Sequence, residues 1–303
     1  MKAAPGAAFV LAAATVWATI GLAGRAAFCA GVTPLEAAFY RAGLSFAVVL
    51  TVTLLTSPAA LRVRARDLWL FAAYGLISIA IFFYVYLYAI ERTSIATAAI
   101  LLYTAPAFVA VLSALIFKEP LTGVRAVAVA LAVAGCVLVV RGYDLVSLRL
   151  NLPGVLAGLA SGFTYAMYSI FGKSALRRYS TRVTLTYALG FGTIFLGGAA
   201  VRSGAVSLVH SAETWLVILY LALVTTLLAG VLYLSGLRRI EPGRASLIAT
   251  IEPVVASVLG YAVLRERLAQ WQVVGGLLVG SVVVIAGRAQ HAAAAEEAEA
   301  RKV

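Results

Sequence analysis

Two adjacent residues at the centre of an apolar run, Glu252 and Pro253, are the clearest sign of chemistry in this sequence. The run, residues 245–264, is long enough to cross a bilayer as a helix. An acid at the middle of such a helix costs about 2.5–3.5 kcal/mol to insert. A proline also removes the backbone donor for the carbonyl four residues earlier, here that of Ala249. Both penalties in one place indicate a segment that faces protein or a water-filled cavity.

Two interpretations of Glu252 follow from its place in the run. It is either a protonatable group or polar anchor in a substrate cavity, which is the default hypothesis for an intramembrane acid, or a neutral carboxylic acid bonded to a neighbouring helix or to the backbone freed by Pro253. Residues 102–107, located 147 positions earlier, repeat the pattern with Pro106 but carry Ala105 in place of the acid. The fold therefore does not need the acid, which favours a functional role.

The two prolines, Pro106 and Pro253, occupy equivalent places in two apolar segments. We expect them to loosen both helices at mid-depth, either as conformational hinges or as fixed kinks. In both cases unwound carbonyls would approach a central site.

Aromatic side chains recur on helical faces inside the apolar runs. Tyr165 and Tyr168 share a face with Ser161 at helical spacing. Because tyrosine hydroxyls at membrane depth need partners, we expect a substrate cavity lined, beside Glu252, by Trp17, Tyr84, Tyr88, Tyr103, Tyr165, Tyr168 and Tyr233. The alternative is a belt at the membrane interface, which suits Tyr74, Tyr143 and Tyr220.

Arg41 is a basic residue well inside an apolar run, six residues into residues 35–56. At about 1.5 Å per residue it lies about 9 Å below the surface. It either extends back to the interface or holds an anionic group in the cavity. We include it among the candidate cavity residues.

The composition sets the class of protein. Of 303 residues, 63% are hydrophobic and 12% charged, with a mean hydropathy of +1.01, so we expect an all-α integral membrane protein. The net charge of +12 comes from basic residues at the ends of apolar runs, which suits lipid headgroups in the bilayer and not nucleic acid. The two cysteines and two histidines give no metal-ligand spacing. We expect no cofactor, no metal and no enzymatic activity.

Ten apolar runs predict ten transmembrane helices. They cover residues 6–27, 35–56, 68–90, 95–117, 123–140, 153–174, 183–201, 214–236, 244–264 and 268–287. Leaving out Arg41, sixteen basic residues fall on one side of these runs and seven on the other. The positive-inside rule then places both termini in the cytoplasm, with the protein in the cell (inner) membrane.

The two halves of the chain repeat. Residues 89–121 align with residues 236–268 at a constant offset, with identities that include Pro106/Pro253 and Glu119/Glu266. Five spans per repeat is an odd number, so the second copy should enter the membrane from the opposite side. We expect a first repeat at 1–146, an inverted second repeat at 147–289 and a polar cytoplasmic tail at 290–303.

Four motifs, duplicated in order, carry a family resemblance. They are Val16-Trp17-Ala18-Thr19 followed by Arg25, Phe39-Tyr40-Arg41-Ala42, Tyr103-Thr104-Ala105-Pro106 running on to Lys118-Glu119-Pro120-Leu121, and Ile251-Glu252-Pro253-Val254 running on to Glu266. Over nearly its whole length the chain resembles the EamA family of the drug/metabolite transporter superfamily. The resemblance implies ten helices around a central cavity and export of small metabolites, often amino acids. Leu189, where the second copy would carry Arg41, and Leu264, in place of a usual glycine, depart from the pattern.

These observations predict a secondary transporter that exports small neutral or zwitterionic metabolites, such as aromatic or other neutral amino acids, by alternating access. Energy would come from gradients, because no nucleotide-binding motif is present; protons could couple through Glu252, or transport could be facilitated diffusion. The alternatives are a multidrug or organic-cation exporter and a non-transport membrane enzyme or scaffold. We expect a monomer, with a dimer as the alternative.

Overall fold

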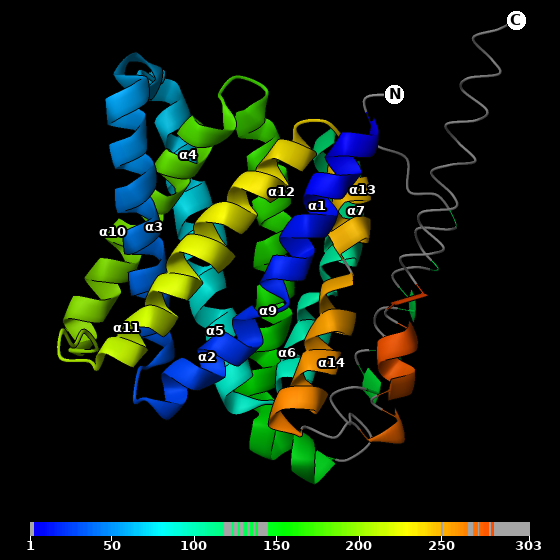
Figure 1. The fold of residues 1–303 in the computed structure, drawn as a ribbon. Coiled ribbons are helices and arrows are strands. Elements are labelled where there is room, and N and C mark those ends of the chain that lie inside the picture. The colour runs from blue at the N-terminus through cyan, green and yellow to red at the C-terminus, as the bar shows by residue number, and fades with distance from the viewer. Residues whose placement is uncertain are drawn as a thin grey trace, which may run out of the picture.

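The computed structural model describes residues 3–117, 145–249 and 251–265, with isolated positions at 123–138 and 269–281. Within this part of the chain every regular element is a helix and no strand occurs (Figure 1). The predicted all-α class is therefore confirmed for the described residues.

The helices follow one another with short connections. The α-helices are α1 (Ala3–Trp17), α2 (Ile20–Cys29), α3 (Pro34–Thr56), α4 (Leu68–Ala73), α5 (Phe82–Arg92), α6 (Ile95–Leu102), α7 (Ala105–Phe117), α9 (Leu145–Leu176), α10 (Thr181–Ser203), α11 (Ala212–Leu219), α12 (Ala229–Leu237), α13 (Pro242–Ala249) and α14 (Ile251–Leu264). Two short 3₁₀ turns, η1 (Pro58–Leu61) and η2 (Ala65–Asp67), and two π-helical segments, η3 (Tyr74–Ile81) and η4 (Tyr220–Leu228), complete the order.

Seven helical stretches in the described residues are long and apolar enough to cross a membrane. They are Gly6–Cys29, Pro34–Thr56, Ala65–Arg92, Asn151–Leu176, Thr181–Ser203, Ala212–Leu237 and Pro242–Leu264, and a shorter apolar helix covers Ile95–Val109. These match eight of the ten predicted spans. The other two, residues 123–140 and 268–287, lie mostly outside the described residues, as does the predicted tail, so the count of ten stays a prediction.

Local chemistry fixes where several helices begin. A hydroxyl at the N-cap of α3, α6, α10 and α11 accepts a hydrogen bond from the backbone N–H three residues later. Such a cap stabilises a helix by about 1 kcal/mol. At the other end of α10, Gly204 adopts a left-handed φ of 63°, which ends the helix without the strain that a side chain would add.

The internal repeat reappears in the irregular parts of the helices. The fourth span is broken between α6 and α7, with Pro106 in the first turn of α7. Proline is tolerated there because the first N–H groups of a helix have no intrahelical partner. In the ninth span Pro253 lies within α14, and residue 250, between α13 and α14, lies outside the described residues, so a break there stays a prediction. The segments η3 and η4 occupy equivalent places in the two repeats. The structure therefore has a true interruption before Pro106; hinge motion at either proline stays a prediction.

Two irregularities were not expected from the sequence. The first span is interrupted at residues 18–19, so that α1 ends at Trp17 and α2 begins at Ile20. The π-helical turns in the third and eighth spans were also not expected. All of these lie at the depth of the pocket described below.

Small residues allow the helices to approach closely. α1 packs on α12, α3 on α10 and α5 on α9 (Figure 1). Along α9, glycines 154, 158 and 162 each face residues of the first repeat. A methyl group on Gly162 would collide with Thr104 Oγ1 and lie 3.0 Å from the carbonyl oxygen of Leu102. This glycine face therefore holds the first helix break against α9.

Candidate functional site

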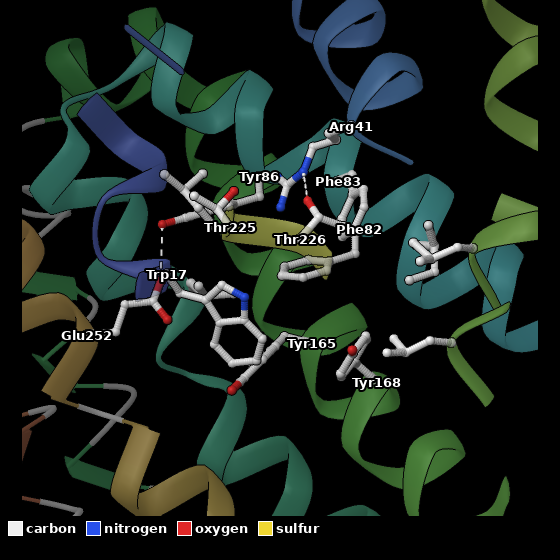
Figure 2. Close-up of a pocket in the computed structure, with 15 residues that line it drawn as sticks. Trp17, Arg41, Phe82, Phe83, Tyr86, Tyr165, Tyr168, Thr225, Thr226 and Glu252 are labelled. Atoms are coloured by element: carbon white, nitrogen blue, oxygen red, sulfur yellow. Dashed lines mark hydrogen bonds between the residues drawn. The ribbon is translucent and has the colours of Figure 1, made fainter. Parts of the chain in front are cut away.

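A narrow pocket lies among the interrupted and π-helical segments and encloses about 520 Å³ of space that atoms do not fill. Its lining residues are Trp17, Ile20, Arg41, Ile79, Phe82, Phe83, Tyr86, Leu102, Tyr165, Tyr168, Leu185, Leu189, Thr225, Thr226 and Glu252 (Figure 2). Both repeats contribute, partly through equivalent positions: Trp17 corresponds to Tyr165, and Arg41 to Leu189. The cation and the acid each come from one repeat only.

The acid of the pocket is Glu252, in the first turn of α14, with 2% of its surface exposed. Tyr103 Oη lies 2.7 Å from its Oε2, and Tyr86 donates a long hydrogen bond of 3.5 Å to its Oε1. Tyr103 Oη also lies 2.6 Å from the carbonyl oxygen of Ala249, the group freed by Pro253. Glu252 thus both lines the pocket and bonds to a neighbouring helix, so the two sequence-based interpretations meet in one arrangement.

The cation of the pocket is Arg41 on α3, which is 2% exposed. Its Nε donates to Thr226 Oγ1 at 2.9 Å, and its guanidinium lies over the ring of Phe83, 4.0 Å from the centroid. Figure 2 shows the guanidinium directed into the pocket. Of the two interpretations of Arg41, extension to the membrane interface is therefore wrong.

Arg41 and Glu252 share the pocket without pairing. None of the ion pairs between described residues involves either side chain. A charge taken out of water is costly unless it is paired and hydrogen-bonded. The pocket therefore presents one positive and one acidic group, each of which can pair with an oppositely charged group of a ligand.

Aromatic rings form one wall. The ring of Trp17, at the end of α1, lies 5.7 Å from that of Tyr165 and 5.0 Å from that of Tyr233, centroid to centroid. Tyr168 stacks on Tyr165 with an interplanar angle of 13°. Tyr233 is fully buried directly behind this wall, where its hydroxyl bonds to Ser169 at 2.8 Å. The Tyr165 hydroxyl makes no hydrogen bond of normal geometry, although it is buried.

Tyr84 and Tyr88 lie outside the pocket, contrary to the sequence-based prediction. Tyr84 is 38% exposed, and Tyr88 packs against Tyr84 and Arg92. The residue of α5 that reaches Glu252 is Tyr86. Residues two positions apart on an α-helix differ by about 200° of rotation. Tyr84 and Tyr88 therefore lie on the opposite side of α5 from Tyr86 and from the pocket. Tyr74, which we assigned to the interface, is fully buried against Tyr168.

Sequence reasoning also missed the residues that the π-helical turns present. Thr226 Oγ1 donates to the carbonyl of Leu221, five residues earlier, at 2.7 Å, while Thr225 donates to the same carbonyl at 2.8 Å. Both threonines line the pocket as a result. The only sign of them in the sequence is a pair of threonines, Thr225 and Thr226, inside the apolar run 214–236. π-helical turns recur at functional sites because they widen the helix locally.

A second cavity, more open and of about 1100 Å³, lies between α3, α10 and α12. It is lined by Val48, Val49, Val52, Ser57, Ala60, Ser180, Thr181, Arg182, Val183, Leu227, Val231, Ser235 and Arg238. Leu227 follows Thr226 of the first pocket directly. The cavity reaches the ends of the helices that the charge distribution assigns to the cytoplasm.

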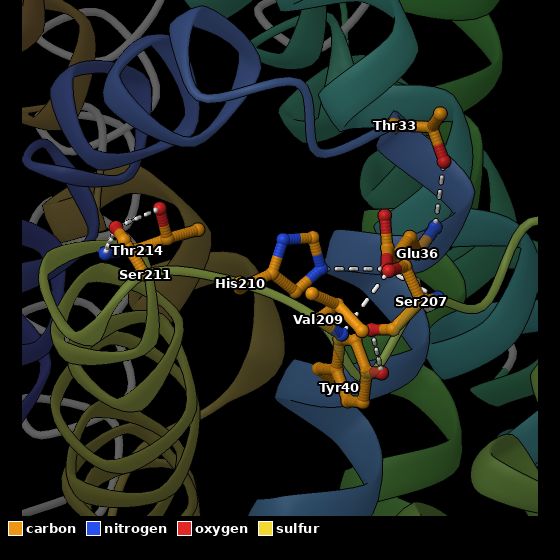
Figure 3. Close-up of polar contacts among 8 residues, drawn as sticks. All are labelled: Thr33, Glu36, Tyr40, Ser207, Val209, His210, Ser211 and Thr214. Carbon is orange, nitrogen blue, oxygen red and sulfur yellow. Dashed lines mark hydrogen bonds and ion pairs between the residues drawn. The ribbon is translucent and has the colours of Figure 1, made fainter.

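A polar cluster fastens the connection between α10 and α11 to the start of α3 (Figure 3). Glu36 Oε1 accepts a hydrogen bond from the Ser207 backbone N–H at 2.8 Å and lies 2.9 Å from His210 Nε2. Tyr40 donates to the Ser207 carbonyl at 2.6 Å. Tyr40 immediately precedes Arg41, so the cluster holds the segment that carries the pocket's cation. No pattern in the sequence pairs Glu36 with His210, which lie 174 positions apart.

Comparison with known proteins gives consistent results. The profile of the EamA-like transporter family matches residues 4–141 and 152–287. An uncharacterized transporter of Archaeoglobus fulgidus is 32% identical over 203 residues, 67% of this chain and 71% of that protein. The uncharacterized transporter YcxC of Bacillus subtilis is 28% identical and covered to 81% on both sides. The uncharacterized inner membrane transporter YicL of Salmonella typhimurium is 25% identical over 74% of this chain and 73% of that protein.

A solved crystal structure superposes with a TM-score of 0.70 over 94% of this chain and 97% of that one. At 18% identity this likeness concerns the fold alone. The family match covers both halves of the chain, in agreement with the internal repeat seen in the sequence and in the paired π-helical segments. This chain is a multi-span membrane protein with two EamA repeats, and it belongs to the EamA-like transporter family.

Proposed function

We propose that this protein is a secondary transporter that exports small neutral metabolites, with zwitterionic amino acids as the main class, by alternating access. One observation carries the proposal: a cation, Arg41, and an acid, Glu252, share an aromatic-walled pocket without pairing with each other. An α-amino acid carries the complementary pair of charges. The relatives named as transporters support transport in general, and the choice of substrate rests on the pocket.

Each part of an amino acid has a partner of suitable chemistry. The substrate carboxylate would meet the guanidinium of Arg41, whose planar fork suits two parallel hydrogen bonds. The ammonium group would meet Glu252 and the faces of the surrounding rings. Trp17 and Tyr165 would contact an apolar side chain.

Alternating access would use the two repeats in opposite orientation, as the odd number of predicted spans per repeat requires. In the predicted orientation the cavity beside Arg182 and Arg238 opens to the cytoplasm and leads toward the pocket. The break before Pro106 and the missing helical hydrogen bond at Pro253 would be the places where the helices bend. Energy would come from an ion gradient, with protons as the coupling ion, or export would run down the substrate gradient.

An organic-cation exporter is the second candidate, because Glu252 among aromatic rings would also suit a quaternary amine. Arg41 counts against it, since a second positive charge in the same dry pocket repels the ligand.

A thermal-stability screen of the purified protein separates the two candidates. We expect stabilisation by neutral amino acids and none by their methyl esters, which keep the ammonium group but lose the carboxylate. The Arg41→Gln variant should lose the response to the free amino acids. Stabilisation by esters and quaternary amines without a response to free amino acids would support the cation exporter instead. Flux of the best ligand into proteoliposomes then tests transport itself.

A further inference from the structure

Tyr103 joins the break in the fourth span to the ninth span, and its single hydroxyl hydrogen cannot serve both of its short contacts there if Glu252 is ionised. Tyr103 directly follows α6, and its hydroxyl oxygen lies 2.6 Å from the Ala249 carbonyl oxygen and 2.7 Å from Glu252 Oε2. A tyrosine hydroxyl donates one hydrogen, whereas a carbonyl and an ionised carboxylate donate none. With an ionised Glu252, only one of these two short contacts can contain a hydrogen.

Neither acceptor has a good substitute. The helical partner of the Ala249 carbonyl would be the N–H of residue 253, which is a proline. Glu252 is 2% exposed, and its other donor, Tyr86, lies at 3.5 Å. A proton on Glu252 resolves the shortage: Glu252 then donates to Tyr103, and Tyr103 donates to Ala249. Both distances fit this chain of donors.

We infer that Tyr103 is a positioning residue that locks the fourth and ninth spans together while Glu252 carries a proton and releases them when the proton leaves. On deprotonation the single Tyr103 hydrogen is drawn to the charged carboxylate, because charge-assisted hydrogen bonds are the stronger ones. The Ala249 carbonyl then loses its donor next to Pro253. The ninth span then becomes free to move relative to the break in the fourth.

The groups that face Glu252 suggest what removes the proton; this step rests on the proposed function. They are Tyr103, Tyr86 of α5, Tyr165 of α9 and Arg41 of α3. Arg41 alone carries a charge, and it does not pair with Glu252. An arriving ammonium group would favour the ionised carboxylate, so the proton would leave to water as the ammonium takes its place. Proton and substrate would thus compete for one acid, and the substrate would unlock the helices.

Hydrogen–deuterium exchange of the full chain in lipid nanodiscs, without any ligand, tests the lock. The peptides of interest cover residues 95–117 and 242–264. Glu213→Gln, at an exposed position of α11, and Tyr88→Phe, outside the pocket, are matched controls measured at each pH to remove the intrinsic pH dependence of exchange. Relative to them, wild-type exchange in these two peptides should rise about two- to tenfold from mildly acidic to mildly alkaline pH, the factor that one hydrogen bond contributes.

The two test variants should both lose the pH response of exchange, one with low exchange and the other with high exchange. Glu252→Gln keeps a donor toward Tyr103 through its amide, so exchange should stay low at every pH. Tyr103→Phe removes the link, so exchange should stay high at every pH. The inference is overturned if both wild-type peptides exchange like those of the controls, or if either variant keeps the wild-type pH response. Should Tyr103→Phe not fold, Glu252→Gln decides alone: high exchange without a pH response contradicts the lock. Because no substrate is present, this result is independent of whether the transport proposal holds.

Discussion

Arg41 and Glu252 each meet hydroxyl groups at the depth of the pocket, and the hydroxyls come from different helices. Thr226 of η4 holds the arginine, and Tyr103 and Tyr86 hold the acid. Neutral partners keep each side chain in place while leaving its charge for a ligand. An ion pair between Arg41 and Glu252 would instead satisfy both groups and leave little for a substrate to gain.

Replacing Arg41 by Gln should weaken binding of free amino acids about 10- to 100-fold, because hydrogen bonds to charged groups contribute about 1.5–3 kcal/mol. Binding of the matching amino-acid amides should change little. Isothermal titration with the best ligand of the screen measures both. Equal loss for acid and amide would show that Arg41 only shapes the pocket.

The tyrosines of α5 should respond to substitution according to the side of the helix that they occupy. Tyr86→Phe removes a hydroxyl directed at Glu252, whereas Tyr84→Phe changes a residue that is 38% exposed. We expect the first to alter the pH dependence of substrate flux in proteoliposomes and the second to leave it as in the wild type. A change in the Tyr84 variant alone would mean that the pocket faces the other side of α5.

At the scale of elements, sequence and structure agree where a strong local signal exists. Pro106 marked the break in the fourth span, and the unusual acid marked one wall of the pocket. The choice of Tyr84 and Tyr88 failed because helical phase cannot be counted through η3, whose π turns add residues to each rotation. Partners distant in sequence, such as Glu36 with His210 or Arg41 with Thr226, carry no local signal at all. They follow from how the helices pack.

The packing of α9 against the first break gives a stability prediction with an internal control. Gly162→Ala would push a methyl group into Thr104 and should destabilise the protein by about 1–3 kcal/mol, the usual cost of overpacking. Gly198→Ala on α10 meets no atom within 4 Å and should be neutral or slightly stabilising. Thermal unfolding in detergent compares the two. A stable Gly162→Ala protein would show that the break is not held tightly.

The Glu36 and His210 cluster should act as one unit. Glu36→Gln and His210→Ala each remove a contact that fastens the connection 204–211 to α3. We expect each to destabilise the protein by about 1–3 kcal/mol and the double variant to cost clearly less than the sum. A double-mutant cycle of thermal unfolding measures the coupling, and additive effects would mean that the two side chains do not interact.

At the scale of the whole molecule, a native cysteine tests the predicted orientation. Cys29 is exposed at the end of α2, on the side that the basic residues assign to the exterior. With Cys136 replaced by Ser, a thiol reagent that cannot cross the membrane should label intact cells, and Cys29→Ser should abolish the signal. If labelling requires opened cells, the predicted orientation is wrong and both termini lie on the exterior side.

The family and its two repeats were predictable from the sequence because motifs and irregularities occur twice in the same order. The pocket was predictable only in outline. Its volume, the inward position of Arg41 and the roles of Tyr86, Thr225 and Thr226 depend on interruptions at residues 18–19 and on two π-helical segments. No hydropathy pattern distinguishes those segments from regular helix.

The position of Trp17 allows the pocket to be followed by tryptophan fluorescence. Its indole is 9% exposed and lies among the rings of Tyr165, Tyr168 and Tyr233. Trp69 and Trp271, by contrast, are 68% and 58% exposed. Excited tyrosines at such short range pass their energy to the indole, so the ultraviolet emission of Trp17 reports whether those four rings stay together. Trp215, the fourth tryptophan, packs on Tyr40 with 5.1 Å between ring centroids and does not line the pocket. In a variant that keeps Trp17 as its single tryptophan, intrinsic fluorescence can therefore follow each opening of the pocket in real time.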